Sequence, residues 1–194
     1  MISQERIDQY IKDGHLEVKI IADSISESGK RLTTFQLKYP RFIHAEIMTH
    51  RVFSRNAGSS RALPVAKMIE QVRTNPAMPI HWGKNQSGMQ AEKEIPQTML
   101  NHAKMDWKLC ADLAAANAEL LSKRGLHKQI ANRILEPFQH MHTILTATEF
   151  DNFFELRIHE DAQPEIYALA LTMKQEIDAS EPKLLKVGEW HLPY

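Results

Sequence analysis

Residues 49–64, THRVFSRNAGSSRALP, gather side chains that bind anions. They include three arginines, three serines, an asparagine and a histidine, and no acid, in a chain where Lys+Arg 24 and Asp+Glu 24 cancel. Arginine forks match phosphate oxygens bidentately, and short hydroxyl and amide groups add hydrogen bonds at little entropic cost. Gly58 would let backbone N–H groups approach a ligand. The segment therefore predicts a phosphate or nucleotide site.

The alternative is a solvated basic loop, which is what isolated charge runs usually are. Phe53, Ala57, Ala62 and Leu63 argue against it, because they predict a partly buried segment. The phosphate loop GxxxxGK[ST] and the dinucleotide fingerprint GxGxxG are both absent from the chain. The predicted anion site is thus of another kind.

Composition limits the remaining classes. At 194 residues, with 43% hydrophobic and 25% charged residues, we expect a single domain over residues 1–194. Zero net charge and a short basic loop argue against nucleic acid, and no apolar run is long enough for a membrane span. The N-terminus is too polar for a signal peptide. The one cysteine, Cys110, fits a reducing compartment, so we expect a cytoplasmic protein, in the host cytoplasm if viral.

Hydrophobic periodicity predicts the elements that must position these residues. A short helix is expected over residues 3–13 with Ser3 as its N-cap, followed by an antiparallel strand pair over 16–25 and 32–39. Pro40 should stop the second strand and start a helix. Further helices are expected over 64–72, 89–122, 127–135, 151–158 and 164–177. The segment 142–150 is rich in β-branched residues, and its first residues are expected to be extended. This predicts an α+β fold, a small antiparallel sheet packed with several helices.

Two overlapping blocks within residues 33–62 and two later blocks point together to a family. HRVFSRNAGSSRA resembles the signature of flavin-dependent thymidylate synthases, which reads Arg-His-Arg, seven residues, then Ser and closely Arg. TTFQLKYPRFIHAEIMTHR is similar to the strand, proline and helix before that signature. ANRILEP and NFFELRIHEDAQPEI resemble two later blocks of the family. The likeness extends from about residue 31 to 170 and implies a thymidylate synthase-complementing protein-like fold.

The resemblance implies a homotetramer that binds FAD and deoxyuridine monophosphate where subunits meet. Methylenetetrahydrofolate would supply the carbon, and NADPH would reduce the flavin. The residues that would bind FAD are His50, Arg51, Val52, Asn56 and Asn152. Those that would hold the nucleotide are Glu46, Ser59, Ser60, Arg61, Arg133 and Arg157, with Ser59 and Arg157 as the catalytic pair. Arg157 would stabilise negative charge on the pyrimidine as C5 becomes nucleophilic.

The chain also departs from the family pattern. Thr49 stands where the signature begins with arginine, Ala57 where a glutamate is usual, and Glu46 where a glutamine precedes the signature. Asn132 and Arg133 compete for the arginine position of their block, and we expect Arg133 to occupy it. Because Thr49 and Ala57 replace a charged arginine and a glutamate, a non-catalytic nucleotide- or flavin-binding protein remains an alternative.

Glu46 raises a question of substrate. A carboxylate accepts hydrogen bonds, and the exocyclic amine of cytosine donates one, whereas O4 of uracil is an acceptor. A cytidine nucleotide such as dCMP, or a hydroxymethyl product, is therefore an alternative to dUMP methylation. The other interpretation is that Glu46 contacts the sugar or Arg61, and this is the one we slightly favour.

Other residues are weaker candidates. His140 and His142 would share one face of a strand, but no third ligand has zinc spacing, so we expect no metal. Trp82, in a polar glycine-bearing loop, could stack on a bound ring or simply lie in a surface connection. Asp161 and Glu165 are expected to pair with arginines. Cys110 lies in an amphipathic helical pattern and is expected to be a buried structural thiol, which leaves no cysteine nucleophile.

Overall fold

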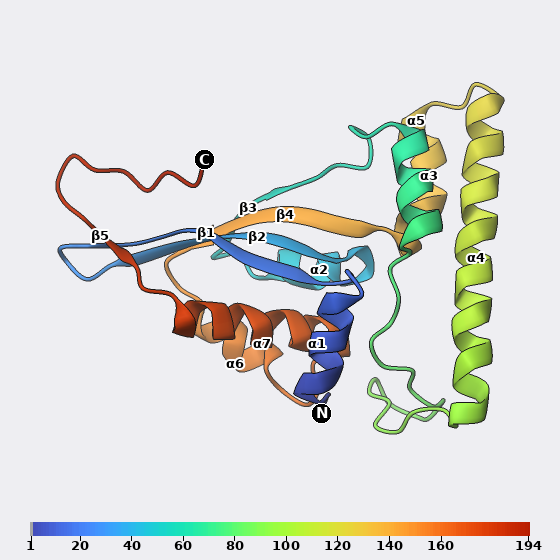
Figure 1. Cartoon of the computed structure of the whole chain (residues 1–194), viewed down its shortest axis with the longest axis horizontal. Helices are drawn as coiled ribbons and strands as arrows, with labels where there is room; N and C mark the ends of the chain where they lie inside the picture. Colours follow the sequence, from blue (N-terminus) through green and yellow to red (C-terminus); the bar gives the residue numbers. More distant parts are fainter. Residues whose placement is uncertain (1) are drawn as a thin grey trace.

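The computed structural model describes residues 2–194, which form a mixed α+β structure around one five-stranded sheet (Figure 1). The strand order is β3-β4-β2-β1-β5. The strands are β1 Glu17–Ser26, β2 Arg31–Pro40, β3 Ser54–Ala57, β4 His140–Ala147 and β5 Lys183–Leu185. β5 pairs in parallel with β1, and the other neighbours are antiparallel. The sheet is thus mixed, where the sequence predicted an antiparallel one.

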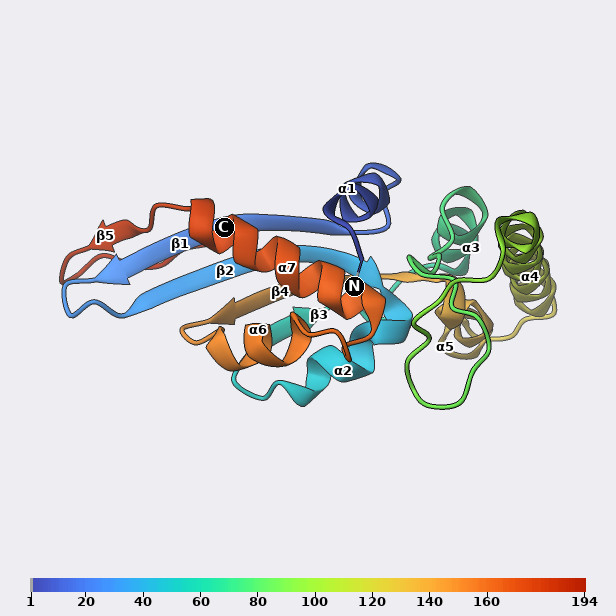
Figure 2. The same cartoon turned by 90° about the horizontal axis from the view of Figure 1, so that it is seen from below.

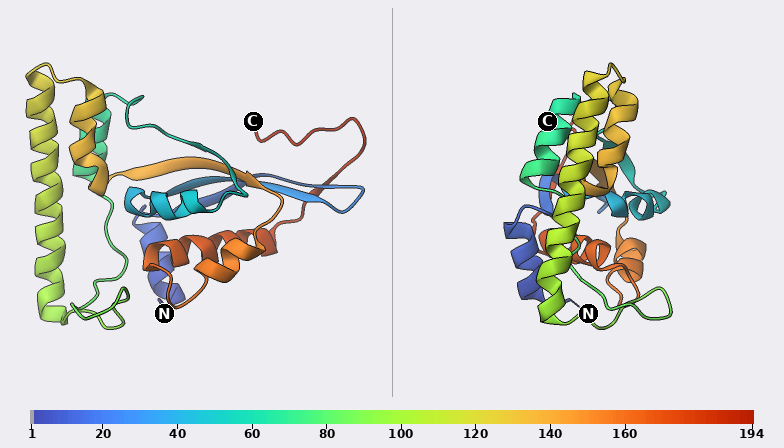
Figure 3. Two further views of the ribbon diagram at one scale, coloured as in Figure 1. Left: turned by 180° about the vertical axis from the view of Figure 1, so that it is seen from behind. Right: turned by 90° about the vertical axis from the view of Figure 1, so that its right-hand side faces the viewer.

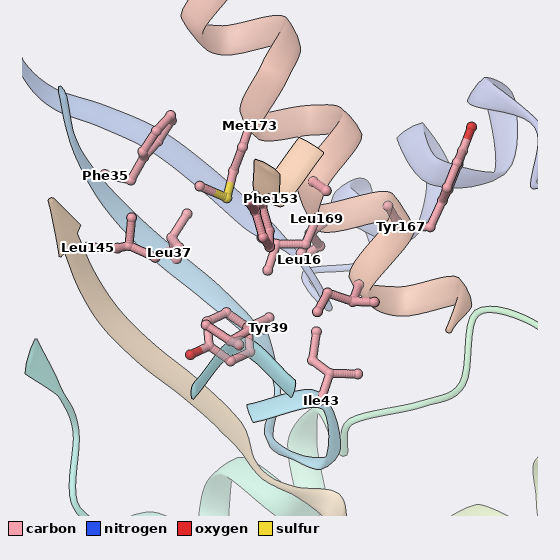
Figure 4. Close-up of a cluster of buried hydrophobic side chains, with 14 of the residues drawn as sticks. Leu16, Phe35, Leu37, Tyr39, Ile43, Leu145, Phe153, Tyr167, Leu169 and Met173 are labelled. Atoms are coloured by element: carbon pink, nitrogen blue, oxygen red, sulfur yellow. The ribbon is translucent and has the colours of Figure 1, made fainter. Parts of the chain in front are cut away.

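One face of the sheet is covered by helices (Figures 1 and 2). In the described part of the chain, the other face carries no helix and is crossed by the C-terminal segment, where His191 hydrogen-bonds Ser24 and Thr34. The covering helices are α1 Gln4–Lys12, α6 Asp151–Arg157 and α7 Pro164–Ala179. Alternate residues of β2, Phe35, Leu37 and Tyr39, are at most 1% exposed and point toward α7 (Figure 4). This alternation sets the register, since a one-residue slip would turn all three side chains to the opposite face.

A second group of helices stands at one end of the sheet (Figure 3). It contains α3 Val65–Thr74, α4 Gln97–Lys123, α5 Lys128–Ala131 and the 3₁₀ helix Asn132–Phe138. Ala111, Ala115 and Ala118 form the buried stripe of α4 and pack with α3 in a core of their own. Small side chains let the two helix backbones approach closely, which explains why alanines rather than leucines face inward.

Except for the buried Leu100, most large apolar side chains of α4 lie away from this alanine stripe. The side chains that are more than half exposed are Met99, Met105, Leu109 and Leu113, and Leu120 is 44% exposed. Cys110 is exposed on the same helix, so the expected buried thiol is wrong. The helical period was predicted correctly, but which side of the helix meets the core was not.

Several boundaries differ from the predictions. α4 begins at Gln97 with Pro96 as its N-cap, so residues 89–96 are not helical, and Gly125, with φ +83°, closes the helix. Pro40 is followed by a 3₁₀ turn, Arg41–Ile43, and then by α2, His44–Thr49. The strands β3 and β5 were not predicted, because each is too short to show a period of two. In residues 2–194 no helix is long and apolar enough to cross a membrane.

A buried carboxylate ties the far end of the sheet to α7. Asp23 of β1 accepts hydrogen bonds from Arg31, Thr33 and Ser180, at 2.6–2.9 Å. Burial acts to raise the pKa of Asp23, but these hydrogen bonds outweigh it and hold the pKa below its ordinary value. The ionised form is therefore the one that the folded state prefers.

Asp23→Ala is expected to lower the free energy of unfolding by about 2–3 kcal/mol at neutral pH, because it leaves Arg31 without its charge partner. Since the folded pKa is depressed, the stabilisation is present above the ordinary carboxyl pKa and is lost as pH falls through the folded value. Urea unfolding from pH 7 to pH 3 measures both effects. Glu149→Ala, which breaks the exposed Lys30–Glu149 pair, serves as control and should cost less than about 1 kcal/mol. An equal loss in both variants would contradict the role of Asp23.

Candidate functional site

Arg157, the last residue of α6, is the centre of the candidate site. Its Nε donates to His50 Nε2 at 2.9 Å, and its Nη1 lies 3.2 Å from a carboxylate oxygen of Glu46. Its Nη2 donates to Thr49 Oγ1 at 3.4 Å. The structure thus brings together three residues that the sequence singled out separately, and all the partners come from α2 and its C-cap.

Tyr39 positions α2. Its hydroxyl, at the end of the buried face of β2, bonds Thr143 Oγ1 of β4 at 2.8 Å and His44 Nδ1 at 2.9 Å. At the other end of α2, Arg55 of β3 donates to the carbonyl oxygens of Ile47 and His50. These bonds add to the turn hydrogen bonds that the same two carbonyls accept from His50 N and Phe53 N, and so brace the end of α2. Of the loop's three arginines, Arg55 therefore acts within the protein.

His50 is neutral in this arrangement. It is 8% exposed, packed against Phe53 and Phe153, and its Nε2 accepts from a guanidinium. Burial, together with the charges of Arg157 and Arg55, lowers the pKa of His50. The proton therefore lies on Nδ1, and the imidazole orients Arg157 through its unprotonated Nε2.

A cleft of about 710 Å³ opens beside this cluster. Glu46 and Arg157 line one wall, Trp107 and Pro137 line the wall toward the second group of helices, and Gln90 belongs to the loop between them. Glu46 contacts Arg157 rather than Arg61, so the arginine partner expected for it is wrong. Its carboxylate keeps one oxygen that makes no hydrogen bond to residues 2–194.

Glu165 is a cleft residue whose role the sequence did not reveal. It is 4% exposed and accepts hydrogen bonds from the backbone N–H of Ile80 at 2.9 Å and from Gln163 at 3.1 Å. Burial raises its pKa. The expected arginine pairing is wrong for Glu165, and Asp161 lies near His159 instead. A carboxylate that fixes a neighbouring backbone N–H leaves no pattern in the sequence.

The other nucleotide-binding candidates form a second cluster around Glu136. Ser60 Oγ donates to this carboxylate at 3.3 Å, and Arg133 and Arg41 pair with it at 2.9 and 3.0 Å. Ser59 and Arg61 are exposed on the adjoining turn. No hydrogen bond within residues 2–194 joins this cluster to Arg157, so the chain presents the two halves of the predicted nucleotide site separately.

Asn132 and Arg133 have different surroundings. Asn132 is fully buried, and its amide donates to the carbonyl oxygens of Ser60 and Leu63, so it holds the basic loop in place. The Arg133 side chain is 54% exposed beside Glu136. Of the two, Arg133 is the residue that can reach a ligand.

The predicted cofactor residues other than His50 lie on the surface. Arg51, Val52, Asn56 and Asn152 are all exposed, and their side chains make no hydrogen bonds within residues 2–194. Arg51 and Val52 follow the C-cap of α2, Asn56 lies in β3, and Asn152 lies at the start of α6. Their free donors suit an anionic, polar ligand bound across that surface. Ala57, in contrast, contributes only apolar contact at the edge of the core.

The remaining candidates have structural environments. His140 is buried, which lowers its pKa to about 3, and it stacks on His15. In residues 2–194 no group of three or more potential ligands could hold a metal ion. Trp82 packs edge-to-face on Trp107, and its backbone N–H donates to Glu94.

Comparison with known proteins identifies the family and the fold. A family model described as thymidylate synthase complementing protein matches residues 4–183. A UMP/dUMP methylase, PolB, from Streptomyces cacaoi bound with 5-Br UMP has a similar fold, with TM-score 0.65, 16% identity, and 82% of this chain and 88% of that chain covered. ThyX from Helicobacter pylori, complexed with FAD and dUMP, gives TM-score 0.50, 20% identity, and coverages of 75% and 67%. No curated protein sequence gives a significant match.

The α+β fold and the family match define a flavin-dependent methyltransferase-like enzyme. The chain belongs to the thymidylate synthase-complementing protein family, because the family model covers almost its full length. The family resemblance predicted from the sequence motifs is thereby confirmed.

Arg157→Met is expected to raise the pKa of His50, because it removes both the nearest cation and the donor to Nε2. Burial and Arg55 would still hold the pKa below its ordinary value. Histidine ring resonances followed by NMR across pH 4–8 measure the shift. Arg133→Met removes a cation from the other cluster and should leave His50 unchanged. An unaltered His50 titration in Arg157→Met would contradict the contact.

Proposed function

We propose that this enzyme uses FAD to transfer a one-carbon unit from methylenetetrahydrofolate to C5 of a pyrimidine deoxynucleotide, most simply converting dUMP to dTMP. The observation that carries the proposal is Arg157, fixed at the edge of a cleft by His50, Glu46 and Thr49. Family membership supports the reaction type. NADPH is the proposed reductant and the cytoplasm the proposed location.

The residues fit FAD on chemical grounds. The exposed side chains of Arg51, Asn56 and Asn152 offer unused donors for its phosphates and polar groups, with Val52 and His50 beside them. The bound flavin would supply the reducing equivalents of the transfer. Thr49, in place of an arginine, hydrogen-bonds Arg157 and so keeps a role in the site without a charge.

The nucleotide is assigned to the two polar clusters. Ser59, Ser60, Arg61 and Arg133 would bind its phosphate, where Ser60 and Arg133 already converge on Glu136. Arg157 would stabilise negative charge that develops on the pyrimidine ring, from a donor geometry fixed in advance. Cys110 lies on α4 and lines neither cluster, which agrees with a reaction that needs no cysteine nucleophile.

A homotetramer would complete the site. In one chain the Ser60–Arg133 cluster and the Arg157 cluster make no direct hydrogen bond, and α4 exposes a long apolar stripe that includes Leu109 and Leu113. Contiguous exposed apolar surface of this kind marks protein–protein contact. We propose that subunits meet through it and bring the two clusters of different chains together.

The protein reconstituted with FAD is expected to be yellow, to be bleached by NADPH, and to form dTMP from dUMP and methylenetetrahydrofolate. Arg157→Ala should lower kcat about 10²–10³-fold, the typical cost of one charge-stabilising donor. Mass spectrometry of the nucleotide product measures turnover. Arg124→Ala, an exposed arginine after α4, is the matched control and should retain full rate. A protein that takes up no FAD, or that is reduced but forms no modified nucleotide, would refute the proposal.

A second candidate substrate is dCMP, and the observation that favours it is the free carboxylate oxygen of Glu46 in the cleft. If Glu46 accepts from the cytosine amine, the wild type will turn over dCMP, and Glu46→Gln will lose about 10–100-fold in kcat/KM for it. The same change should not impair dUMP, because a glutamine amide can donate to O4. Parallel assays with dUMP and dCMP decide, with products analysed for methyl and hydroxymethyl groups. Exclusive use of dUMP by both proteins would exclude the cytidine alternative.

A further inference from the structure

A second cleft, of about 460 Å³, lies between α1 and α4. Lys104 and Lys108 of α4 line one wall, and the opposite wall comes from Gln9, Asp13 and His15. We call this the dilysine cleft. Its floor is the segment that follows α3, including Met78, Pro79 and Ile80.

The dilysine cleft has positive charge that the protein does not neutralise. Within residues 2–194 neither Lys104 nor Lys108 is paired with a carboxylate, whereas the third cation, Arg6, is held bidentately by Glu94 at 2.6 and 2.8 Å. Asp13 is the single acid in the lining. The two lysines are one helical turn apart, so their side chains start about 5–6 Å from each other on one face.

Lys108 also acts on the wall that faces it. The pKa of His15 is lowered, first by burial and then by the charges of Lys38 and Lys108, while Asp13 opposes them. This places the Lys108 ammonium close enough to the imidazole to influence it across the cleft. A bound anion would remove that repulsion, which offers a readout of binding at His15.

The dilysine cleft is next to the candidate site. Pro79 lines both clefts, and Trp82 on one side contacts Trp107 on the other edge-to-face. The dividing segment is held by hydrogen bonds from Ile80 N to Glu165 and from Trp107 Nε1 to the carbonyl of Ala77. The two clefts are therefore adjacent, and a long ligand with its ring beside Arg157 would cross the segment at Pro79 to reach the two lysines.

We propose that the dilysine cleft binds carboxylates spaced along a flexible chain, with Lys104 and Lys108 as the binding residues. The source that the arrangement favours is the γ-linked glutamate tail of the folate carbon donor, and this assignment rests on the proposed function. A free oligocarboxylate is the other source of the same chemistry. The methylenes of such a chain would lie on the apolar floor formed by Met78, Pro79 and Ile80.

Direct binding tests the site without turnover. Calorimetric titration of the full-length protein with tri-γ-glutamate should give a saturable isotherm. Binding of the peptide should also raise the pKa of His15, which NMR measures. Both effects should be lost in Lys104→Ala/Lys108→Ala. They should persist in Lys12→Ala/Lys183→Ala, which removes two exposed cations that line neither the dilysine cleft nor the cleft beside Arg157. No binding, or binding that is equal in both double variants, would overturn the site.

Kinetics with two forms of the donor identify the source. The wild type should show a KM roughly three- to tenfold lower for the triglutamate than for the monoglutamate of methylenetetrahydrofolate, as expected for two exposed ion pairs. Lys104→Ala/Lys108→Ala should abolish this difference with kcat unchanged. Peptide binding with equal KM values supports the site and assigns it to a free oligocarboxylate. Peptide binding without any nucleotide product would refute the proposed function and leave the site supported.

Discussion

The buried face of β2 is the constraint on which the rest of the structure depends. Phe35, Leu37 and Tyr39 must face α7, and this fixes both the register of β2 and the side on which its next turn emerges. Because Tyr39 also carries a hydroxyl, the last of the three joins Thr143 and His44 and so orients α2. Tyr39 thus belongs to the core and also positions the candidate site.

The position of α2 in turn determines which charged and polar side chains surround Arg157. His50 and Glu46 contact Arg157 of α6, which lies more than a hundred positions later in the sequence. The guanidinium reaches a neutral imidazole on one side and a carboxylate on the other, so its orientation is set before any ligand is bound. Such prior orientation is what makes a single cation effective against charge that develops in a reaction.

The second group of helices has a different physical character. Its core is built on alanines of α4 against α3, and Met105, Leu109 and Leu113 of α4 remain exposed. The same helix lines both clefts, with Trp107 toward Arg157 and Lys104 and Lys108 toward α1. Different sides of α4 therefore contribute to a core, to two clefts and to an exposed apolar surface.

The sequence by itself determined the α+β class, most helices, the central strands β1, β2 and β4, and the family, since these rest on local periodicity, caps and contiguous motifs. It did not predict β3 or β5, whose few residues are extended only because β4 and β1 offer edges to pair with. Nor could it tell which side of α4 is buried, because leucines and alanines alternate there and only the approach of α3 selects the alanines.

For the site, motifs pointed to His50, Glu46, Thr49 and Arg157 as separate residues, and only the tertiary structure joined them. It also gave Glu165 and Asn132 their roles, which depend on backbone groups distant in sequence. Glu136 likewise gained distant side-chain partners, Ser60 and Arg41. Residue types can indicate what chemistry a chain carries. The distances between partners, and therefore charge compensation and pKa, are set by packing alone.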